Sequence, residues 1–231
     1  MSYKLKTRDK KQSSTYKPEY PMELKLNPIT SNQKRYAKAI EDKAIIFGTG
    51  IAGSGKTFIA VGKACQALEN RDIENILVTR PVIECGRNLG ALPGELEDKF
   101  APYMHPFRQH FNHFLHGKFE TYKRCGKIKA VPLEFMRGST FSNKYVLLDE
   151  AQNTTIKQMK MFLTRIGENC KLIITGDTEQ SDLNEPNGLE HITLLLDNRT
   201  DPDIGVILFE EKDCVRSKMA RKVLQIYREE G

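Results

Sequence analysis

Short apolar runs alternate with helical patterns along this chain, and the alternation predicts the fold class. The runs expected to form buried strands are 44–47, 75–79, 145–148, 171–175 and 205–209. Apolar residues at helical spacing predict helices at about 58–68, 155–166, 189–196 and 216–229. Strands that alternate with helices favour an α/β fold with a parallel sheet and helices on both faces.

A further helix is expected before the first strand. Thr30 and Gln33 stand at the spacing of a capping box, in which two side chains satisfy backbone N–H groups at a helix start. Tyr36, Ala37 and Ile40 follow at helical spacing. The ordered domain is therefore expected to begin near residue 22 and to continue to residue 231.

The residues directly after the first apolar run have the spacing G-x-x-x-x-G-K-[ST], which is typical of a phosphate-binding loop. Glycines let successive backbone N–H groups converge on phosphate oxygens, and the following helix points its positive end at the same place. A glycine-rich turn can match by chance, but the position between a strand and a helix favours nucleotide binding. The residues expected to bind the nucleotide are Gly50, Ile51, Ala52, Gly53, Ser54, Gly55, Lys56 and Thr57.

Two adjacent acids supply the expected second half of the site. Asp149 and Glu150 follow the apolar run 145–148, which is the arrangement of a Walker B strand. We expect Thr57 and Asp149 to hold Mg²⁺, with Asp149 acting through water. Glu150 is expected to polarise the attacking water, and Lys56 to reach the β- and γ-phosphates. Two solvated acids at a strand end are the alternative, which the preceding loop motif makes weaker.

A third polar cluster lies at the end of the run 171–175. Thr175 closes this run, and Asp177 follows after a glycine. Open α/β sheets bind ligands at the carboxyl ends of their strands, so either side chain is a candidate sensor of the γ-phosphate. A plain Gly-Asp turn is the alternative.

Composition limits the size of the protein and the class of its partners. The chain has 231 residues, 39% of them hydrophobic and 29% charged, which suffices for one soluble α/β domain. Residues 1–21 are expected to form a disordered basic arm, because Lys and Arg crowd this segment. The arm and the net charge of +6 fit either a polyanionic partner or a solubility tail.

The expected location is the cytoplasm, without a membrane partner. No apolar run approaches membrane-spanning length, and the N-terminus lacks the apolar segment of a signal peptide. The five cysteines are scattered and form no C-x-x-C pair, which argues against both a zinc site and a disulfide framework. Such cysteines suit a reducing compartment.

The segment 103–129 combines histidines, phenylalanines and basic residues, and three interpretations stay open. Convergent histidines would form a metal site, although His110 and His116 point in different directions on a helix. Basic residues among aromatic rings would form a stacking surface for single strands of nucleic acid. The third possibility is a phenylalanine face that packs on the core while the charged residues face water.

With these features placed, the sequence resembles the PhoH family of P-loop ATPases, which are related to superfamily 1 RNA helicases. The resemblance runs from about residue 32 to residue 227. The stretches that carry it beyond the phosphate-binding loop are Asn32-Gln33-Lys34-Arg35-Tyr36, Thr79-Arg80-Pro81, 89–94 (LGALPG), Phe135-Met136-Arg137-Gly138, 148–155 (LDEAQNTT) and Thr175-Gly176-Asp177. It implies a single RecA-like domain that uses ATP and Mg²⁺.

The resemblance also implies roles that spacing alone does not assign. Gln33 is similar to the glutamine that reads the adenine edge in helicase-like ATPases, and Gln152 to a residue that couples the γ-phosphate to water. Arg216 stands in Val-Arg-Ser where the family carries Val-Arg-His, and Arg165 lies in a second family-like setting. Either arginine is a candidate arginine finger; a surface salt bridge is the alternative for both.

A single RecA-like module usually takes its finger from another module, so we expect a homo-oligomeric ring, specifically a hexamer. The expected function is ATP hydrolysis by a helicase-like motor on RNA or single-stranded DNA, with Arg80 and Arg87 as candidate contacts. The alternatives are a nucleotide-dependent regulator or scaffold with little turnover, an ATPase partner of a nuclease, and a small-molecule kinase. No acidic cluster suited to two-metal cleavage is visible, which argues against intrinsic nuclease activity.

Overall fold

The structure is a computed structural model, and it describes residues 24–81, 104–178 and 180–217, with positions 219, 220, 222 and 226 beyond them. The expected basic arm at 1–21 lies outside the described residues. So does Arg87, together with the part of the family-like segment between residues 82 and 103.

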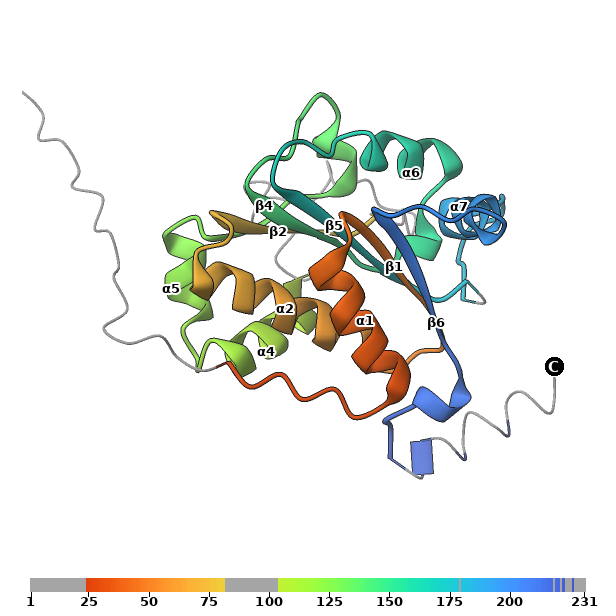
Figure 1. The fold of residues 1–231 in the computed structure, drawn as a ribbon, viewed down its shortest axis with the longest axis horizontal. Helices are drawn as coiled ribbons and strands as arrows, with labels where there is room; N and C mark the ends of the chain where they lie inside the picture. Colours follow the sequence, from red (N-terminus) through yellow and green to blue (C-terminus); the bar gives the residue numbers. More distant parts are fainter. Residues whose placement is uncertain are drawn as a thin grey trace, which may run out of the picture.

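The described residues build a parallel sheet of six strands in the order β3-β2-β4-β5-β1-β6 (Figure 1). The strand bounds are β1 Ile45–Gly50, β2 Asn75–Thr79, β3 Ile128–Ala130, β4 Lys144–Leu148, β5 Cys170–Gly176 and β6 Ile204–Phe209. The parallel sheet expected from the sequence is confirmed. The short edge strand β3 was not expected.

Helices cover both faces of the sheet (Figure 1). Packed with the core of one face are α1 Ser31–Asp42, α2 Lys56–Asn70, α4 His105–Phe114 and α5 Phe119–Arg124. The other face carries α6 Ile156–Leu163 and α7 Gly188–Asp197. Three short 3₁₀ helices complete the described elements: η3 Leu133–Met136, η4 Ala151–Asn153 and η5 Glu211–Asp213. The expected α/β class, a parallel sheet with helices on both faces, is therefore confirmed.

Local sequence explains where the first helix starts. The Thr30 side chain accepts a hydrogen bond from the Gln33 backbone, and the Gln33 side chain accepts one from the Thr30 backbone. The expected capping box is thus confirmed. At the other end of the chain, Arg216 lies before the last helical positions, although a helix from residue 216 was expected.

The structure supports one of the three interpretations of the segment 103–129, the phenylalanine face packed on the core. Its aromatic side chains are buried in the core: Phe107, Phe111, Phe114, Phe119 and Tyr122. A stacking surface for single strands is therefore wrong here, because no base can reach these rings. Nor do the described residues contain a group of three or more His, Cys, Asp or Glu side chains placed to hold a metal ion. The phenylalanine face that packs on the core is confirmed.

The topology brings the candidate polar segments to one place. All described strands run in the same direction, so their carboxyl ends share one edge of the sheet. The phosphate-binding loop leaves β1, the acid pair leaves β4, and Asp177 follows β5. Strand β5 pairs with both β1 and β4, so it lies between the two halves of the predicted site. None of the described helices is both long and apolar enough for a bilayer crossing.

Candidate functional site

The phosphate-binding loop wraps between β1 and α2. Gly50 begins it with a φ of +105°, and an added Cβ there would lie 2.1 Å from the carbonyl oxygen of Phe209. Only glycine fits such a close approach at a positive φ. At the other end of the loop, α2 begins at Lys56. The positive end of this helix therefore faces the cavity that Gly55, Lys56 and Thr57 line.

Lys56 is buried inside the loop, with 8% of its surface exposed. Its Nζ donates to the carbonyl oxygens of Gly50 at 2.5 Å and Ile51 at 2.7 Å. Burial lowers the pKa of Lys56 to about 8, although the carboxylates of Asp177, Asp149 and Glu150 oppose the shift. The ammonium is thus held by neutral carbonyl acceptors beside the cavity that Lys56 lines.

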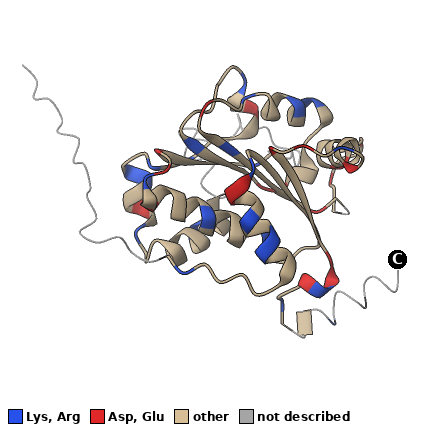
Figure 2. Cartoon of the chain, viewed as in Figure 1, with Lys and Arg blue, Asp and Glu red and all other residues tan. Residues whose placement is uncertain are grey.

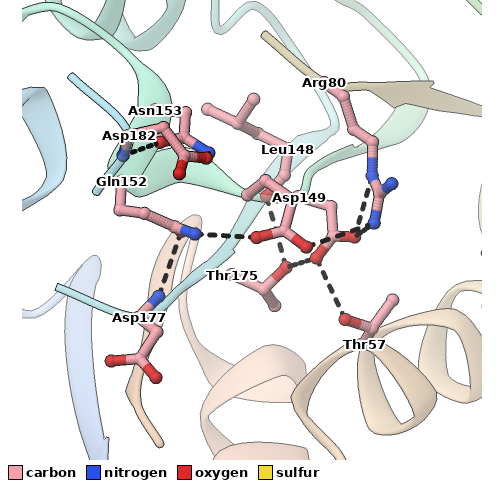
Figure 3. A network of polar contacts seen from close by, with 10 residues as sticks. Thr57, Arg80, Leu148, Asp149, Gln152, Asn153, Thr175, Asp177 and Asp182 are labelled. Carbon is pink, nitrogen blue, oxygen red and sulfur yellow. Dashed lines mark hydrogen bonds and ion pairs between the residues drawn. The ribbon is translucent and has the colours of Figure 1, made fainter. Parts of the chain in front are cut away.

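The two halves of the predicted site meet at Asp149 (Figure 3). Its Oδ1 accepts a hydrogen bond from the Thr57 hydroxyl at 3.0 Å and another from the Thr175 hydroxyl at 2.6 Å. Asp149 is buried. Thr175 therefore helps to position the acid, and its expected contact with a γ-phosphate stays a prediction.

Arg80 contacts the same carboxylate from the end of β2. Its Nε donates to Oδ2 of Asp149 at 3.1 Å, and its Nη2 lies 3.5 Å from Oε1 of Glu150. The guanidinium also lies over the Phe107 ring, 5.4 Å from the centroid. The charge of Arg80 is thus directed at the acid pair, and the expected contact of Arg80 with nucleic acid stays a prediction.

Gln152 joins the acid pair to the end of β5 (Figure 3). Its Nε2 donates to Oε2 of Glu150 at 2.7 Å, and its Oε1 accepts from the Asp177 backbone at 3.1 Å. The Asp177 carboxylate in turn accepts from the Ala52 backbone in the phosphate-binding loop at 3.1 Å. A continuous chain of hydrogen bonds thus runs from Glu150 through Gln152 and Asp177 to the loop.

Gln33 and Arg216 approach the loop from opposite ends of the chain. Gln33 Nε2 donates to the Ser54 carbonyl at 2.9 Å, while its Oε1 accepts from the Ile29 amide at 2.8 Å and from the Thr30 amide of the capping box at 3.4 Å. The Val215 backbone donates to the Gly53 carbonyl at 3.0 Å, and a Cβ on Gly53 would lie 2.4 Å from Arg216 Nε. Arg216 therefore crosses directly over the loop of its own chain.

Arg165 lies elsewhere. Its carbonyl accepts from the Phe141 backbone at 2.8 Å, before the start of β4, which is the amino edge of the sheet. Arg165 does not line the cavity. Within one chain the structure brings Arg216 to the site and leaves Arg165 at the opposite edge.

An open cavity of about 660 Å³ lies over these residues. From the predicted set it is lined by Gln33, Ala52, Gly53, Gly55, Lys56, Thr57, Asp149, Glu150, Asp177 and Arg216. Gly50, Ile51 and Ser54 shape the loop from behind: the Ser54 hydroxyl donates to the Ile51 carbonyl at 2.8 Å. A cavity of this size is in the usual range for a nucleotide-sized ligand.

Sequence reasoning missed several wall residues, which are Asn27, Ile29, Phe58, His110, Gln180 and Val215. Val215 stands directly before Arg216 in the family-like Val-Arg-Ser, whereas the other five share no motif, so no spacing signal could have found them. Ile29 and Val215 are exposed apolar side chains. Burial lowers the pKa of His110, and Asp149 partly opposes the shift.

The donor set fits a magnesium nucleotide. Thr57 and Asp149 offer hard oxygen atoms that converge within hydrogen-bond distance. Mg²⁺ commonly takes one or two protein oxygens and completes its shell with waters and phosphate oxygens. The loop amides, the helix end and Lys56 are the donors that a polyphosphate requires.

Comparison with known proteins agrees with this geometry. The PhoH family, described as PhoH-like protein, matches residues 25–228. Protein PhoH of Escherichia coli (strain K12) is 44% identical over 200 residues, which cover 84% of this chain and 56% of that protein. The PhoH-like protein of Bacillus subtilis (strain 168) is 41% identical over 201 residues, which cover 86% of this chain and 62% of that protein. The chain spans less than two thirds of the length of these relatives.

Solved structures with a related fold are more distant. A Sulfolobus solfataricus SWI2/SNF2 ATPase core in complex with dsDNA has a TM-score of 0.43 and 15% identity, covering 70% of this chain and 34% of that chain. The Pif1 helicase from Candida albicans has a TM-score of 0.40 and 12% identity, covering 80% of this chain and 40% of that chain. The family match and the identities of 44% and 41% carry the assignment, and this chain belongs to the PhoH family.

Proposed function

We propose that this protein binds ATP with Mg²⁺ and hydrolyses it. We further propose that it uses the hydrolysis as a helicase-like motor on RNA or single-stranded DNA. The observation that carries the ATPase proposal is the 3.0 Å hydrogen bond between the Thr57 hydroxyl and the Asp149 carboxylate. Thr57 lies at the start of α2 and Asp149 follows β4, 92 positions away in sequence, and their meeting leaves the P-loop lysine and the second acid around one cavity.

Nucleotide binding would reuse donors that are now held by protein acceptors. The Ala52 amide is bound to Asp177, and the Lys56 ammonium to loop carbonyls. Charged phosphate oxygens are stronger acceptors for Lys56 than the neutral carbonyls that now hold it, and for the Ala52 amide they would replace the Asp177 carboxylate by another anionic acceptor. Ile29 and Val215 would contact the apolar faces of the base, with Gln33 beside them at the same end of the cavity.

Thr57 and Asp149 would hold the metal. When bound, Mg²⁺ neutralises charge on the β- and γ-phosphate oxygens. Arg80 must then share or release the Asp149 carboxylate, since its Nε donates to Oδ2 of that group.

Glu150 would orient and polarise the water that attacks the γ-phosphorus. Gln152 fixes the Glu150 carboxylate at 2.7 Å and connects it to Asp177, so the base is held in one orientation. Arg216 would offset charge on the phosphates from within the same chain. Arg165 could act only from a neighbouring copy, in a homo-oligomeric ring that we propose to be a hexamer.

The polymer partner is supported by charge and by family. The net charge of +6 favours a polyanion, and the family is related to superfamily 1 RNA helicases. Electrostatic binding of this kind weakens as salt is raised.

The test is ATP turnover beside nucleotide affinity in the full chain. Glu150→Gln keeps the shape of the side chain but removes the base, so turnover should fall by about 10²–10⁴-fold while the affinity for ATP is retained. Unchanged turnover would remove Glu150 as the base. A wild-type protein that binds ATP without hydrolysing it, with or without RNA and single-stranded DNA at low salt, would favour a regulator instead.

A further inference from the structure

We propose that a surface made of Phe135, Arg137, Lys157 and Lys160 binds single-stranded nucleic acid, with the Phe135 ring stacked on a base. This Phe135 surface lies on η3, on the loop that follows it and on the adjoining side of α6. The proposal deepens the proposed function, on which it rests for the polymer partner.

Phe135 is held outward by the packing of its neighbours. Its side chain is 57% exposed, whereas Leu133 and Met136 are 0% and 1% exposed. A 3₁₀ helix has three residues per turn, so Leu133 and Met136 share the buried side while Phe135 faces away. Within the described ranges, no other Phe or Tyr side chain is exposed. The exposure of Phe135 is therefore built into the anchored turn.

Basic side chains lie on the loop that follows this ring and on the adjoining helix α6. Arg137 follows it on the same loop, and Lys157 and Lys160 stand three positions apart on α6; all three are exposed. Helix α6 packs against η3, and Gln158 Nε2 donates to Oε1 of Glu134 at 3.2 Å where the two helices meet. Figure 2 shows Lys and Arg along α6 and on the loop beside it. Glu134 is the acid within this group, so the three cations outnumber it.

The Phe135 surface adjoins the nucleotide site through the backbone. The Leu133 amide donates to the carbonyl of Arg80 at 3.3 Å, and the side chain of Arg80 contacts Asp149. The Asp149 amide in turn donates to the Thr79 carbonyl at 3.1 Å. A nucleic-acid strand bound at Phe135 would thus be linked to Asp149, the acid proposed to hold the metal, through the backbone hydrogen bonds of Leu133 with Arg80 and of Asp149 with Thr79.

The chemistry favours a nucleic acid over a second copy of the chain. A protein interface of useful size needs several apolar side chains at its centre. The other large apolar side chains that are exposed lie on different elements, among them Leu194 and Leu195 on α7 and Val206 and Leu208 on β6. A lone ring among cations suits one stacked base between phosphates.

The first test measures the affinity of the full chain for fluorescein-labelled oligothymidylate and oligouridylate of about twelve nucleotides at low salt. Phe135→Ala should weaken binding by about 5- to 150-fold, and Phe135→Tyr should restore it. Leu194→Ala removes an apolar side chain that is 66% exposed, against 57% for Phe135, and should leave the affinity unchanged. An abasic oligomer of the same length should bind wild type and Phe135→Ala alike, because it offers no base for stacking. The tighter of the two labelled oligomers identifies DNA or RNA as the ligand.

The second test is the slope of log affinity against log salt. Arg137→Gln and a Lys157→Gln, Lys160→Gln double variant should each lower the slope, by about 0.7 for each phosphate that the variant fails to neutralise. Lys34→Gln on α1 serves as the matched control and should leave the slope unchanged.

Equal oligonucleotide affinity for wild type and Phe135→Ala overturns this inference alone, provided that wild type binds. No binding by wild type at low salt overturns the polymer part of the proposed function as well. A change of assembly mass in Phe135→Ala without a change of affinity would assign the surface to a second copy. Nucleotide affinity in Phe135→Ala should equal that of wild type, which separates these outcomes from misfolding.

Discussion

Arg80 and Asp149 form an ion pair at the point where the metal of a P-loop ATPase would bind. The Arg80 guanidinium donates a hydrogen bond to Oδ2 of Asp149, while the hydroxyls of Thr57 and Thr175 donate to Oδ1. A divalent cation and a guanidinium cannot both sit at full contact on one buried carboxylate without repulsion. The pair therefore sets the metal in competition with an arginine of the same chain.

Removal of that arginine should change the affinity for Mg²⁺. Arg80→Gln frees Asp149, so the Mg²⁺ concentration that half-saturates magnesium-dependent nucleotide binding should fall by about 3- to 10-fold. A titration of Mg²⁺ with a fluorescent ADP analogue measures it directly.

The control is Arg108→Gln, which removes an exposed arginine paired with Glu120 at 3.2 Å. This variant should behave as wild type. If Arg80→Gln needs more Mg²⁺ than wild type, Arg80 assists the metal site and does not compete with the metal.

Nucleotide affinity should fall with rising pH because of Lys56. Its pKa of about 8 lies below that of an ordinary lysine, and a bound polyphosphate restores the charged form. The dissociation constant should be flat below pH 8 and rise about tenfold per pH unit above it, roughly 30-fold by pH 9.5. Lys56→Ala should bind weakly with no such dependence, which a fluorescence titration across this range would show.

The lowered pKa of Lys56 also makes the stability of the nucleotide-free protein depend on pH, in the direction opposite to that of the nucleotide affinity. Between pH 8 and the ordinary lysine pKa of 10.5, the unfolded chain binds more protons at Lys56 than the folded chain does. The free energy of unfolding should therefore gain a contribution that rises with pH in this window. Denaturant titration of wild type and Lys56→Met across this pH range measures the contribution of Lys56. If the free energy of unfolding depends on pH equally in both proteins, the pKa of Lys56 is not lowered by folding.

Gln152 should affect turnover without affecting binding. Gln152→Met keeps the length of the side chain but removes the donor to Glu150 and the acceptor for the Asp177 amide. A misdirected base typically costs about 10²-fold in rate, so turnover should fall by that order while ATP affinity stays close to wild type. Asn153→Ser, which removes the two neighbouring hydrogen bonds between Asn153 and Asp182, is the control and should retain turnover. Equal rates in the two variants would argue against an orienting role for Gln152.

The parts of the site that the sequence predicted are those fixed by local chemistry. Glycine spacing defines the phosphate-binding loop, and the acids at the end of β4 follow an apolar run that only a buried strand explains. The capping box at Thr30 is likewise a local pattern, and the structure confirms it. Such features need only their own neighbours in sequence.

The parts that escaped prediction depend on tertiary contacts. The contact of Arg80 with Asp149, which is 69 positions away in sequence, has no local signal that could have predicted it. Strand β3 is short and pairs only at one edge of the sheet, so its apolar run is too brief to stand out. The burial of the aromatic residues in 103–129 was one of three interpretations that the sequence left open, and only the tertiary contacts chose between them.

Mixing of variant chains should separate the two candidate arginine fingers. Arg216 lies over the loop of its own chain, and Arg165 lies at the opposite edge of the sheet. Arg216→Ala should lower turnover by up to about 10³-fold, whatever the assembly. Mixed with Glu150→Gln, it should gain nothing, because every site then lacks its own base or its own Arg216.

Arg165→Ala should behave differently if it acts between copies in a ring. Its sites retain Glu150, and a neighbouring Glu150→Gln chain can supply the missing Arg165, so the mixture should exceed the average turnover of the two separate variants. The readout is ATP turnover of the co-assembled chains at a mass confirmed in solution. If Arg165→Ala alone turns over ATP as fast as wild type, Arg165 is excluded as a finger. If Glu150→Gln rescues Arg216→Ala, Arg216 acts on the next subunit instead of on its own.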